Sequence, residues 1–299
     1  MTEEEFTLSD RITKIKSINE RYGLENNAYL SFSGGKDSTV LHYLIDEALP
    51  NNNIPRVYIN TGIEYQMVVQ FVKKLAAEDK RIIIINPKQN IRDMLEENGY
   101  PFKSKEHSLY LSVYQNSGNS KSVTKYLNRI DSRFACPDNL RYQFSKDFKL
   151  KVSNRCCYKL KKDIAKNYQR ESNRNITITG MRKEEGGLRS GIKGCTIFAE
   201  DRLEKFHPLL PLDENFIQWY VESRKIKLSE LYYPPYNFKR TGCLCCPYSI
   251  DLQNQLDVLA LYLPNERKRA EIIWKPVYDE YRRIGYRLDK RHSLFDELF

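Results

Sequence analysis

The chain has 299 residues, of which 40% are hydrophobic and 29% charged, a composition typical of a soluble globular protein with one large or two modest domains. The longest purely aliphatic run, Ile82 to Ile85, is far too short to cross a bilayer, and the acidic start MTEEEFTLSD lacks the apolar stretch of a signal peptide. We therefore expect a cytoplasmic protein with no membrane partner; its net charge of +10 fits either a polyanionic partner or a solvated basic surface.

Short β-branched runs alternate with longer amphipathic stretches, which predicts βαβ units and a parallel sheet. Strands are predicted at Ala28–Ser33, Arg56–Asn60, Ile82–Asn86 and Ile176–Gly180. Helices are predicted at Ser38–Glu47, Tyr65–Ala77, Ile91–Asn98 and Cys157–Asn167. The polar stretch Gln115–Val123 predicts a mobile loop that could act as a lid.

After Pro211 the sequence predicts helices and no strand, with helices at Asp213–Val221 and Asn265–Ile284. The expected fold class is therefore α/β, a doubly wound parallel sheet with a C-terminal helical extension. We expect three parts: an N-terminal helical segment at 1–27, a nucleotide-binding domain at 28–210, and a helical region at 211–299 that carries a Cys-x-x-Cys motif.

The hexapeptide SGGKDS, Ser33 to Ser38, directly follows the apolar strand AYLSF and opens a helix. Glycines let the backbone approach a phosphate, and the N-terminus of a helix presents N–H groups and a positive dipole end to it. The loop is not a Walker A motif, because Leu30 and Asp37 stand where that motif needs Gly and Ser or Thr. The loop therefore predicts a phosphate-binding site formed by Ser33, Gly34, Gly35, Lys36, Asp37 and Ser38.

The strand–SGGKDS–helix arrangement resembles the PP-loop pyrophosphatases, whose fold is adenine nucleotide alpha-hydrolase-like. This resemblance implies that the loop binds the phosphates of ATP or a related adenine nucleotide. Further motifs over residues 28–250 resemble the phosphoadenylyl-sulfate and adenylyl-sulfate reductases of that superfamily. These are YINTGIE at Tyr58–Glu64, with Asn60 in place of the usual Asp, GMRKEE at Gly180–Glu185, and HPL at His207–Leu209.

The resemblance implies a role for residues outside the loop. Thr61, Gly62 and Glu64 would lie beside the nucleotide, together with Gly180 at a strand end. Arg182 and Arg189 would pair with phosphate or sulfonate oxygens, because a guanidinium binds oxyanions through two parallel hydrogen bonds. Asp37, Lys36 and Arg182 are the predicted catalytic residues, with Asp37 positioning Mg²⁺.

Five of the seven cysteines fall in two short motifs, Cys156-Cys157 and Cys243-Leu-Cys245-Cys246. A reducing cytosol disfavours disulfides, so this clustering indicates a metal site. The CC…CxxC pattern resembles that of adenylyl-sulfate reductases, which implies a [4Fe-4S] cluster on Cys156, Cys157, Cys243 and Cys246. Zinc and free buried thiols stay open as alternatives.

The reductases end in a tail with a catalytic cysteine, and no cysteine follows Cys246 in this sequence. We therefore expect ATP-dependent activation and sulfur transfer onto nucleic acid, as in DNA phosphorothioation or tRNA thiolation, with a cysteine desulfurase or a thioredoxin-like protein as donor. One alternative is a sulfonucleotide reductase that uses Cys195, Cys136 or Cys245 instead. Another is a non-catalytic nucleotide sensor.

Residues 121–163 hold twelve Lys and Arg against four acids. Aromatic residues are interleaved with them, at Tyr126, Phe134, Tyr142 and Phe148. Basic residues mixed with aromatics suit a phosphate backbone and unstacked bases, so this segment is the predicted nucleic-acid contact. Basic residues between 267 and 283 support the same interpretation.

Overall fold

A computed structural model of the chain describes residues 2–129, 135–186 and 189–289. The chain divides into two compact units. The first comprises Met1–Asn60, Glu64–Pro87 and Ile164–Thr241, and the second Thr61–Ile63, Lys88–Asp163 and Gly242–Phe299. The predicted boundaries after residues 27 and 210 stay a prediction.

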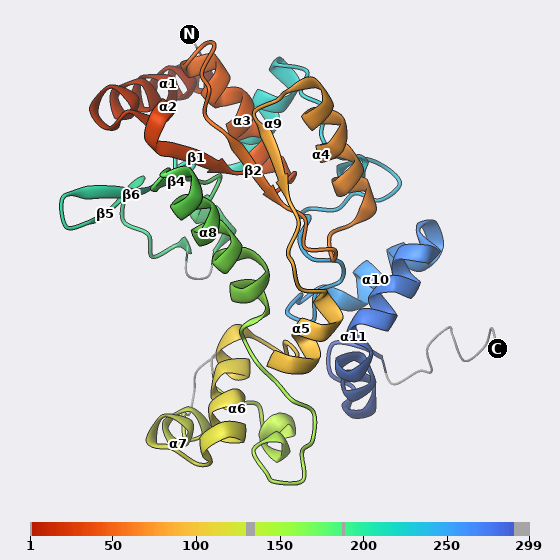
Figure 1. Cartoon of the computed structure of the whole chain (residues 1–299). Helices are drawn as coiled ribbons and strands as arrows, with labels where there is room; N and C mark the ends of the chain where they lie inside the picture. The colour runs from red at the N-terminus through yellow and green to blue at the C-terminus, as the bar shows by residue number, and fades with distance from the viewer. Residues whose placement is uncertain (1, 130–134, 187–188, 290–299) are drawn as a thin grey trace. The chain divides into compact units, whose positions relative to one another are not determined.

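The first unit is built on a six-stranded sheet in the order β3-β2-β1-β4-β6-β5. In Figure 1, the strands β5, β6, β4, β1 and β2 are labelled in that order from left to right. Its strands are β1 (Ala28–Ser31), β2 (Arg56–Ile59), β3 (Ile82–Ile85), β4 (Ile176–Ile178), β5 (Thr196–Ala199) and β6 (Arg202–Phe206). Neighbouring strands from β3 to β6 are parallel, and β5 pairs with β6 in the antiparallel sense. The α/β class with a largely parallel sheet is confirmed, and all four predicted strands are present, each slightly shorter at its C-terminal end.

The prediction lacked the hairpin of β5 and β6. Arg202, Glu204 and Lys205 interrupt any alternation of apolar residues in β6, so the local pattern gives no strand signal. In the structure β6 pairs with β4, Ile178 opposite Phe206, and it buries Leu203 and Phe206. Pairing with a distant strand therefore decides this element.

Helices of the first unit are α1 (Glu3–Tyr22), α2 (Leu24–Asn27), α3 (Lys36–Ala48), α4 (Gln66–Glu78), α9 (Glu214–Ser223) and most of α8 (Asp163–Ser172). Local sequence explains the ends of α1. Thr2 and Glu5 form a reciprocal capping box at its start, and Gly23 ends it in the left-handed region, with φ 60°. The short 3-10 helices Lys183–Glu185 and Glu230–Tyr232 also belong to this unit.

The strand order places a topological switch point between β1 and β4. The chain runs outward from β1 to β2 and β3, and then returns to add β4 on the other side of β1. Doubly wound sheets bind ligands beyond the carboxyl ends of the strands at such a point. The SGGKDS loop follows β1, and Gly180 follows β4.

Helices of the second unit are α5 (Ile91–Asn98), α6 (Lys105–Ser117), α7 (Lys121–Leu127), α10 (Leu252–Tyr262) and α11 (Pro264–Ile284). It also contains the 3-10 helix Asp138–Gln143 and the π-helical turn Tyr158–Lys162, which occupies the start of the helix predicted at Cys157–Asn167. Among the described residues, no helix is both long and apolar enough to cross a membrane.

The predicted loop at Gln115–Val123 is wrong. Helix α6 continues to Ser117, and α7 begins at Lys121, where the Ser120 side chain accepts the Val123 N–H as an N-cap. The Gln115 side chain bonds the backbone of Leu150 and Val152. Capping and these tertiary contacts order a stretch whose composition resembles a linker.

Candidate functional site

The SGGKDS loop is held by bonds between its own residues. The N–H of Ser33 donates to Ser38 Oγ at 3.2 Å, the Gly35 N–H donates to Ser33 Oγ at 3.3 Å, and the Ser38 hydroxyl donates to the Gly35 carbonyl at 2.9 Å. Gly34 has φ +69°, and a Cβ there would lie 2.5 Å from a methyl of Val72. Position 34 therefore requires glycine on both conformational and steric grounds.

Lys36 begins α3, so its N–H is one of the donors at the helix N-terminus that have no partner within the helix. This N–H donates to the hydroxyl of Tyr232 at 2.9 Å, and that hydroxyl also lies 2.8 Å from Thr241 Oγ1. The Lys36 ammonium forms an ion pair with Glu214, the first residue of α9. Tyr232 and Glu214 were not predicted, because they lie some 200 and 180 positions away in sequence.

Arg182 is 5% exposed and binds three carboxylates. Its guanidinium contacts Asp37 at 2.9 Å, Glu184 at 2.7 Å and Glu214 at 2.6 Å. Burial raises the pKa of Asp37, and the charge of Arg182 only partly opposes this. Burial acts in the same direction on Glu214, but hydrogen bonds and charge from Lys36 and Arg182 outweigh it and lower the pKa of that carboxyl.

The structure thus brings Lys36, Asp37 and Arg182 into one ion-pair network through Glu214. Gly180 lies against the start of α3, where a Cβ would come 3.0 Å from the Asp37 carbonyl carbon. Such close approach explains glycine there as a packing requirement. Arg189 instead pairs with Glu185, which Arg240 also contacts at 2.9 Å.

The YINTGIE motif is divided between the units. Thr61 and Gly62 belong to the second unit, and Glu64 to the first. Thr61 and Glu64 are buried, while Gly62 has φ +82° with open space around its Cβ position. A nucleotide-binding role for these three residues stays a prediction.

The four cysteines of the predicted ligand set belong to the second unit, where they interact electrostatically. Cys156 and Cys157 have their sulfur atoms 4.0 Å apart, and the Cys246 N–H donates to the Cys243 carbonyl at 3.3 Å. The pKa of Cys156 is raised mainly by its hydrogen bond with Cys157 and by burial. The charges of Cys157, Cys246 and Cys243 raise it further. Burial and the charges of Cys243 and Cys157 likewise raise the pKa of Cys246.

Four thiolates at this place therefore repel one another unless a cationic centre lies among them. A metal ion or cluster supplies such a centre and deprotonates its thiol ligands. The hydrogen bond with Cys156, followed by the charges of Lys105, Lys161 and Lys162, lowers the pKa of Cys157 to about 6. The three lysines thus contribute positive charge at this place. The residues present fit an iron–sulfur cluster by donor type and number.

Side chains of helix α11 donate hydrogen bonds to backbone carbonyls of the second cysteine motif and of Pro247, the residue that follows it. Trp274 Nε1 donates to the Leu244 carbonyl at 2.8 Å, Tyr278 donates to the Cys245 carbonyl, and Tyr281 donates to the Pro247 carbonyl at 2.9 Å. The three aromatics are almost fully buried and lie at i, i+4 and i+7 on one helix face. That spacing was visible in the sequence, but nothing local indicated which backbone it contacts.

A sequence profile of the phosphoadenosine phosphosulfate reductase domain matches residues 27–135 and 129–249. The chain belongs to this family. An uncharacterized protein of Methanocaldococcus jannaschii is 25% identical over 282 residues, which cover 91% of this chain and 56% of the relative. The chain spans about half the length of that relative.

Solved structures of low identity are also similar to the chain. Phosphoadenylyl-sulfate reductase from Candida auris, in a phosphate complex, is 14% identical with a TM-score of 0.45, covering 81% of this chain and 96% of its own. The U34-tRNA thiolase of Methanococcus maripaludis with its [4Fe-4S] cluster is 15% identical with a TM-score of 0.41, covering 94% and 80%.

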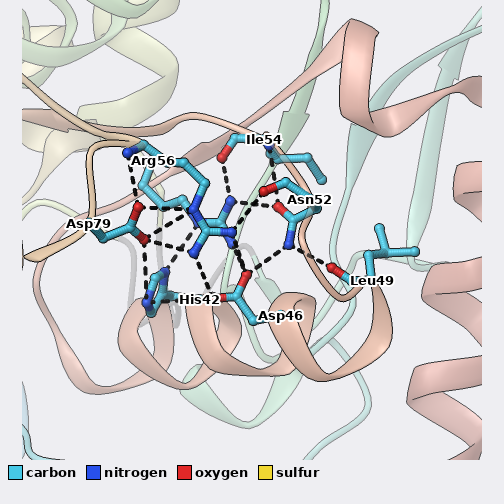
Figure 2. Close-up of polar contacts among 8 residues, drawn as sticks. His42, Asp46, Leu49, Asn52, Ile54, Arg56 and Asp79 are labelled. Carbon is cyan, nitrogen blue, oxygen red and sulfur yellow. Dashed lines mark hydrogen bonds and ion pairs between the residues drawn. The ribbon is translucent and has the colours of Figure 1, made fainter.

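His42, Asp46 and Asp79 lie close together in the first unit (Figure 2). Two arginines neutralise the two carboxylates of this group. Arg56, fully buried, contacts Asp46 at 2.6 Å and donates to His42 Nδ1 at 3.1 Å. Arg81 contacts both Asp46 and Asp79 at 2.8 Å. The carboxylates are already satisfied by guanidinium groups, so this family member uses the group as a structural network.

The network predicts a loss of stability in mild acid. Burial, followed by the charge of Arg56, lowers the pKa of His42 from 6.5 to about 4. The folded state thus binds fewer protons than the unfolded chain, and stability is lost as the pH falls from 6.5 towards 4. We expect the free energy of unfolding to lose about 2 kcal/mol from His42 between pH 7 and 5.

Urea denaturation at both pH values checks this expectation in the wild type and in His42→Gln. The variant should lose less stability between pH 7 and 5 than the wild type, because glutamine does not titrate. Equal losses in the two proteins would show that His42 is not a source of the pH dependence. His107, also with a pKa lowered to about 4, offers a matched comparison as His107→Gln.

The predicted nucleic-acid segment needs correction at Tyr126. Its ring is 1% exposed and stacked on Tyr110 at 4.6 Å, and its hydroxyl bonds His107 Nδ1 at 2.9 Å. It is therefore a core residue and has no free face for a base. Tyr142 is 36% exposed, with Arg283 lying over its ring. Phe134 lies outside the described residues.

Much of the predicted positive charge is neutralised by neighbouring carboxylates. Arg129 pairs with Glu106 at 2.9 Å and Arg141 with Asp138 at 2.8 Å. On α11, Arg267, Arg269, Lys275, Arg282 and Arg283 all form ion pairs. Exposed lysines remain in the segment at Lys121, Lys125, Lys146 and Lys149.

Proposed function

We propose that this family member activates an acceptor with ATP and then transfers sulfur to it, the acceptor being a nucleic acid. The observation that carries the proposal is the SGGKDS loop at the sheet's switch point, with Lys36 and Arg182 in one network beside it. Backbone N–H groups at the start of α3 and these two cations are the donors that a polyphosphate needs. Asp37 is the proposed residue for positioning Mg²⁺.

The reaction proceeds in two balanced steps. An oxygen of the acceptor attacks the α-phosphorus of ATP, which forms an adenylated acceptor and releases pyrophosphate. In the second step the terminal sulfur of a cysteine desulfurase persulfide displaces AMP, which leaves a disulfide between donor and acceptor. A thioredoxin-like dithiol reduces this S–S bond, so that sulfur stays on the acceptor and the donor cysteine returns as a thiol. Lys36 and Arg182 would neutralise charge on the phosphates during the first step, because such charge grows on the leaving pyrophosphate.

Cys156, Cys157, Cys243 and Cys246 are the proposed ligands of a [4Fe-4S] cluster. Their number, donor type and mutual repulsion support this assignment, and adjacent cysteines are unusual in structural zinc sites. When bound, the cluster would supply iron chemistry towards sulfur. The protein's part is to hold the four thiolates and to offset their charge with Lys105, Lys161 and Lys162.

Family membership favours a second candidate, a sulfonucleotide reductase with a substitute nucleophile. Cys195 is half-buried in the first unit and accepts a contact from Arg11 at 3.6 Å, whereas Cys136 and Cys245 are buried. Thioredoxin-dependent release of sulfite that disappears in Cys195→Ser would establish this activity. Tight ATP binding without formation of AMP would instead indicate a nucleotide sensor.

Mass spectrometry of nucleosides and dinucleotides tests the proposed acceptor. Cells that contain the wild-type protein should hold a sulfur-bearing species that is absent when Arg182 is replaced by Ala, because that change removes a phosphate ligand. Restoring the wild-type gene should restore the species. Identical profiles in all three strains would refute nucleic acid as the acceptor.

A further inference from the structure

Oxygen atoms of the protein itself engage the phosphate-binding groups of the first unit. The Glu214 carboxylate contacts both the Lys36 ammonium and the Arg182 guanidinium, one oxygen to each. The Tyr232 hydroxyl accepts the Lys36 N–H at 2.9 Å. The two cations and the Lys36 N–H, which would bind a phosphate, thus already have partners within the protein.

Glu214 differs from the other carboxylates of the network. Asp37 and Glu184 each contact Arg182, while Glu214 bridges both cations. Its side chain is 45% exposed, close to the 50% of Glu184 and against 24% for Asp37, and it stands at the first residue of a helix capped by Asp213. A carboxylate in that position is free to turn towards solvent without unfolding an element.

The charges show why an anion has to compete with it. Asp37, Glu184 and Glu214 place three negative charges against the two positive charges of Lys36 and Arg182. A polyphosphate added to this arrangement meets net repulsion unless a carboxylate withdraws. Glu214 is the group whose departure frees both cations at once.

We propose that Glu214 is an internal competitor for the phosphate site, with the Tyr232 hydroxyl acting in the same way on the Lys36 N–H. Both are positioning residues that hold Lys36 and Arg182 in place and are displaced when phosphate binds. This inference rests on the proposed function, since it assumes that the SGGKDS loop binds phosphates. It adds a residue that sets the affinity of the site by opposing the ligand.

Titration calorimetry with ATP and with inorganic pyrophosphate tests the competition. Both titrations contain EDTA, so that binding of Mg²⁺ by a carboxylate does not contribute to the measured affinity. Glu214→Gln should bind each ligand about tenfold more tightly than the wild type, since the two part-buried ion pairs of Glu214 no longer oppose binding. Tyr232→Phe should tighten binding by about threefold, because one hydrogen bond is removed from the competing state.

Glu222→Gln is the matched control, since it removes the same charge from the same helix at a residue bonded to Gln218. Its affinities should equal those of the wild type. Unchanged or weaker binding in Glu214→Gln would overturn the inference. If Glu214→Gln binds pyrophosphate more tightly but no variant binds ATP, the inference is retained and binding of an adenine nucleotide is refuted. If no variant binds either ligand, both the inference and the proposed function are refuted.

Discussion

Replacing Cys157 or Cys246 with Ser is expected to turn a brown protein colourless. Anaerobically purified wild type should contain about four iron and four sulfide ions per chain, as a cluster held by four thiolates does. Serine lacks the soft thiolate that iron prefers, so each variant should lose most of the iron and the associated visible absorption. Iron and acid-labile sulfide assays, together with the absorption spectrum, measure the loss.

Cys195→Ser is the control for the cluster. It removes a half-buried thiol from the first unit and should keep the colour and the iron content of the wild type. A colourless wild type with one zinc ion per chain would contradict the cluster and assign the four cysteines to zinc. The ligand set itself would then survive with a different metal.

Gly35→Val is expected to abolish nucleotide binding while the chain still folds. A Cβ at position 35 would lie 3.1 Å from Thr241 Oγ1 and 3.3 Å from the oxygens of Ser33 and Tyr232. The two further methyl groups of valine would extend into the space where the loop's N–H groups present themselves to a phosphate. Calorimetric titration with ATP should show at least a hundredfold loss of affinity, about 3 kcal/mol.

Gly194→Val serves as the comparison for this loss. A Cβ at position 194 meets only the Thr196 carbonyl, at 4.0 Å, so the substitution is expected to leave ATP affinity unchanged. Circular dichroism should show the same helix content in both variants as in the wild type. Wild-type affinity in Gly35→Val would remove the SGGKDS loop from the nucleotide site.

Local sequence was sufficient for elements whose signal is contained in a few neighbouring residues. The aliphatic runs around β1, β2 and β3 and the glycine pair of the loop were read directly, as was helix α5, whose bounds agree with the prediction. The hairpin of β5 and β6 was not predicted, because the pairing of β6 with β4 determines it. The start of α7 was not predicted either, because the Ser120 cap determines it. Composition alone made the segment around Tyr126 look like a binding surface.

The sequence by itself determined the α/β class, the position of the SGGKDS loop and the cysteine motifs, since each follows from spacing along a short stretch of chain. Tertiary structure alone decided that Glu214 and Tyr232 engage Lys36, that Trp274 and its neighbours on α11 hold the Cys-x-x-Cys backbone, and that Tyr126 is buried. The physical reason is separation: these contacts join residues tens to hundreds of positions apart. No local propensity encodes which distant carbonyl or carboxylate a side chain will meet.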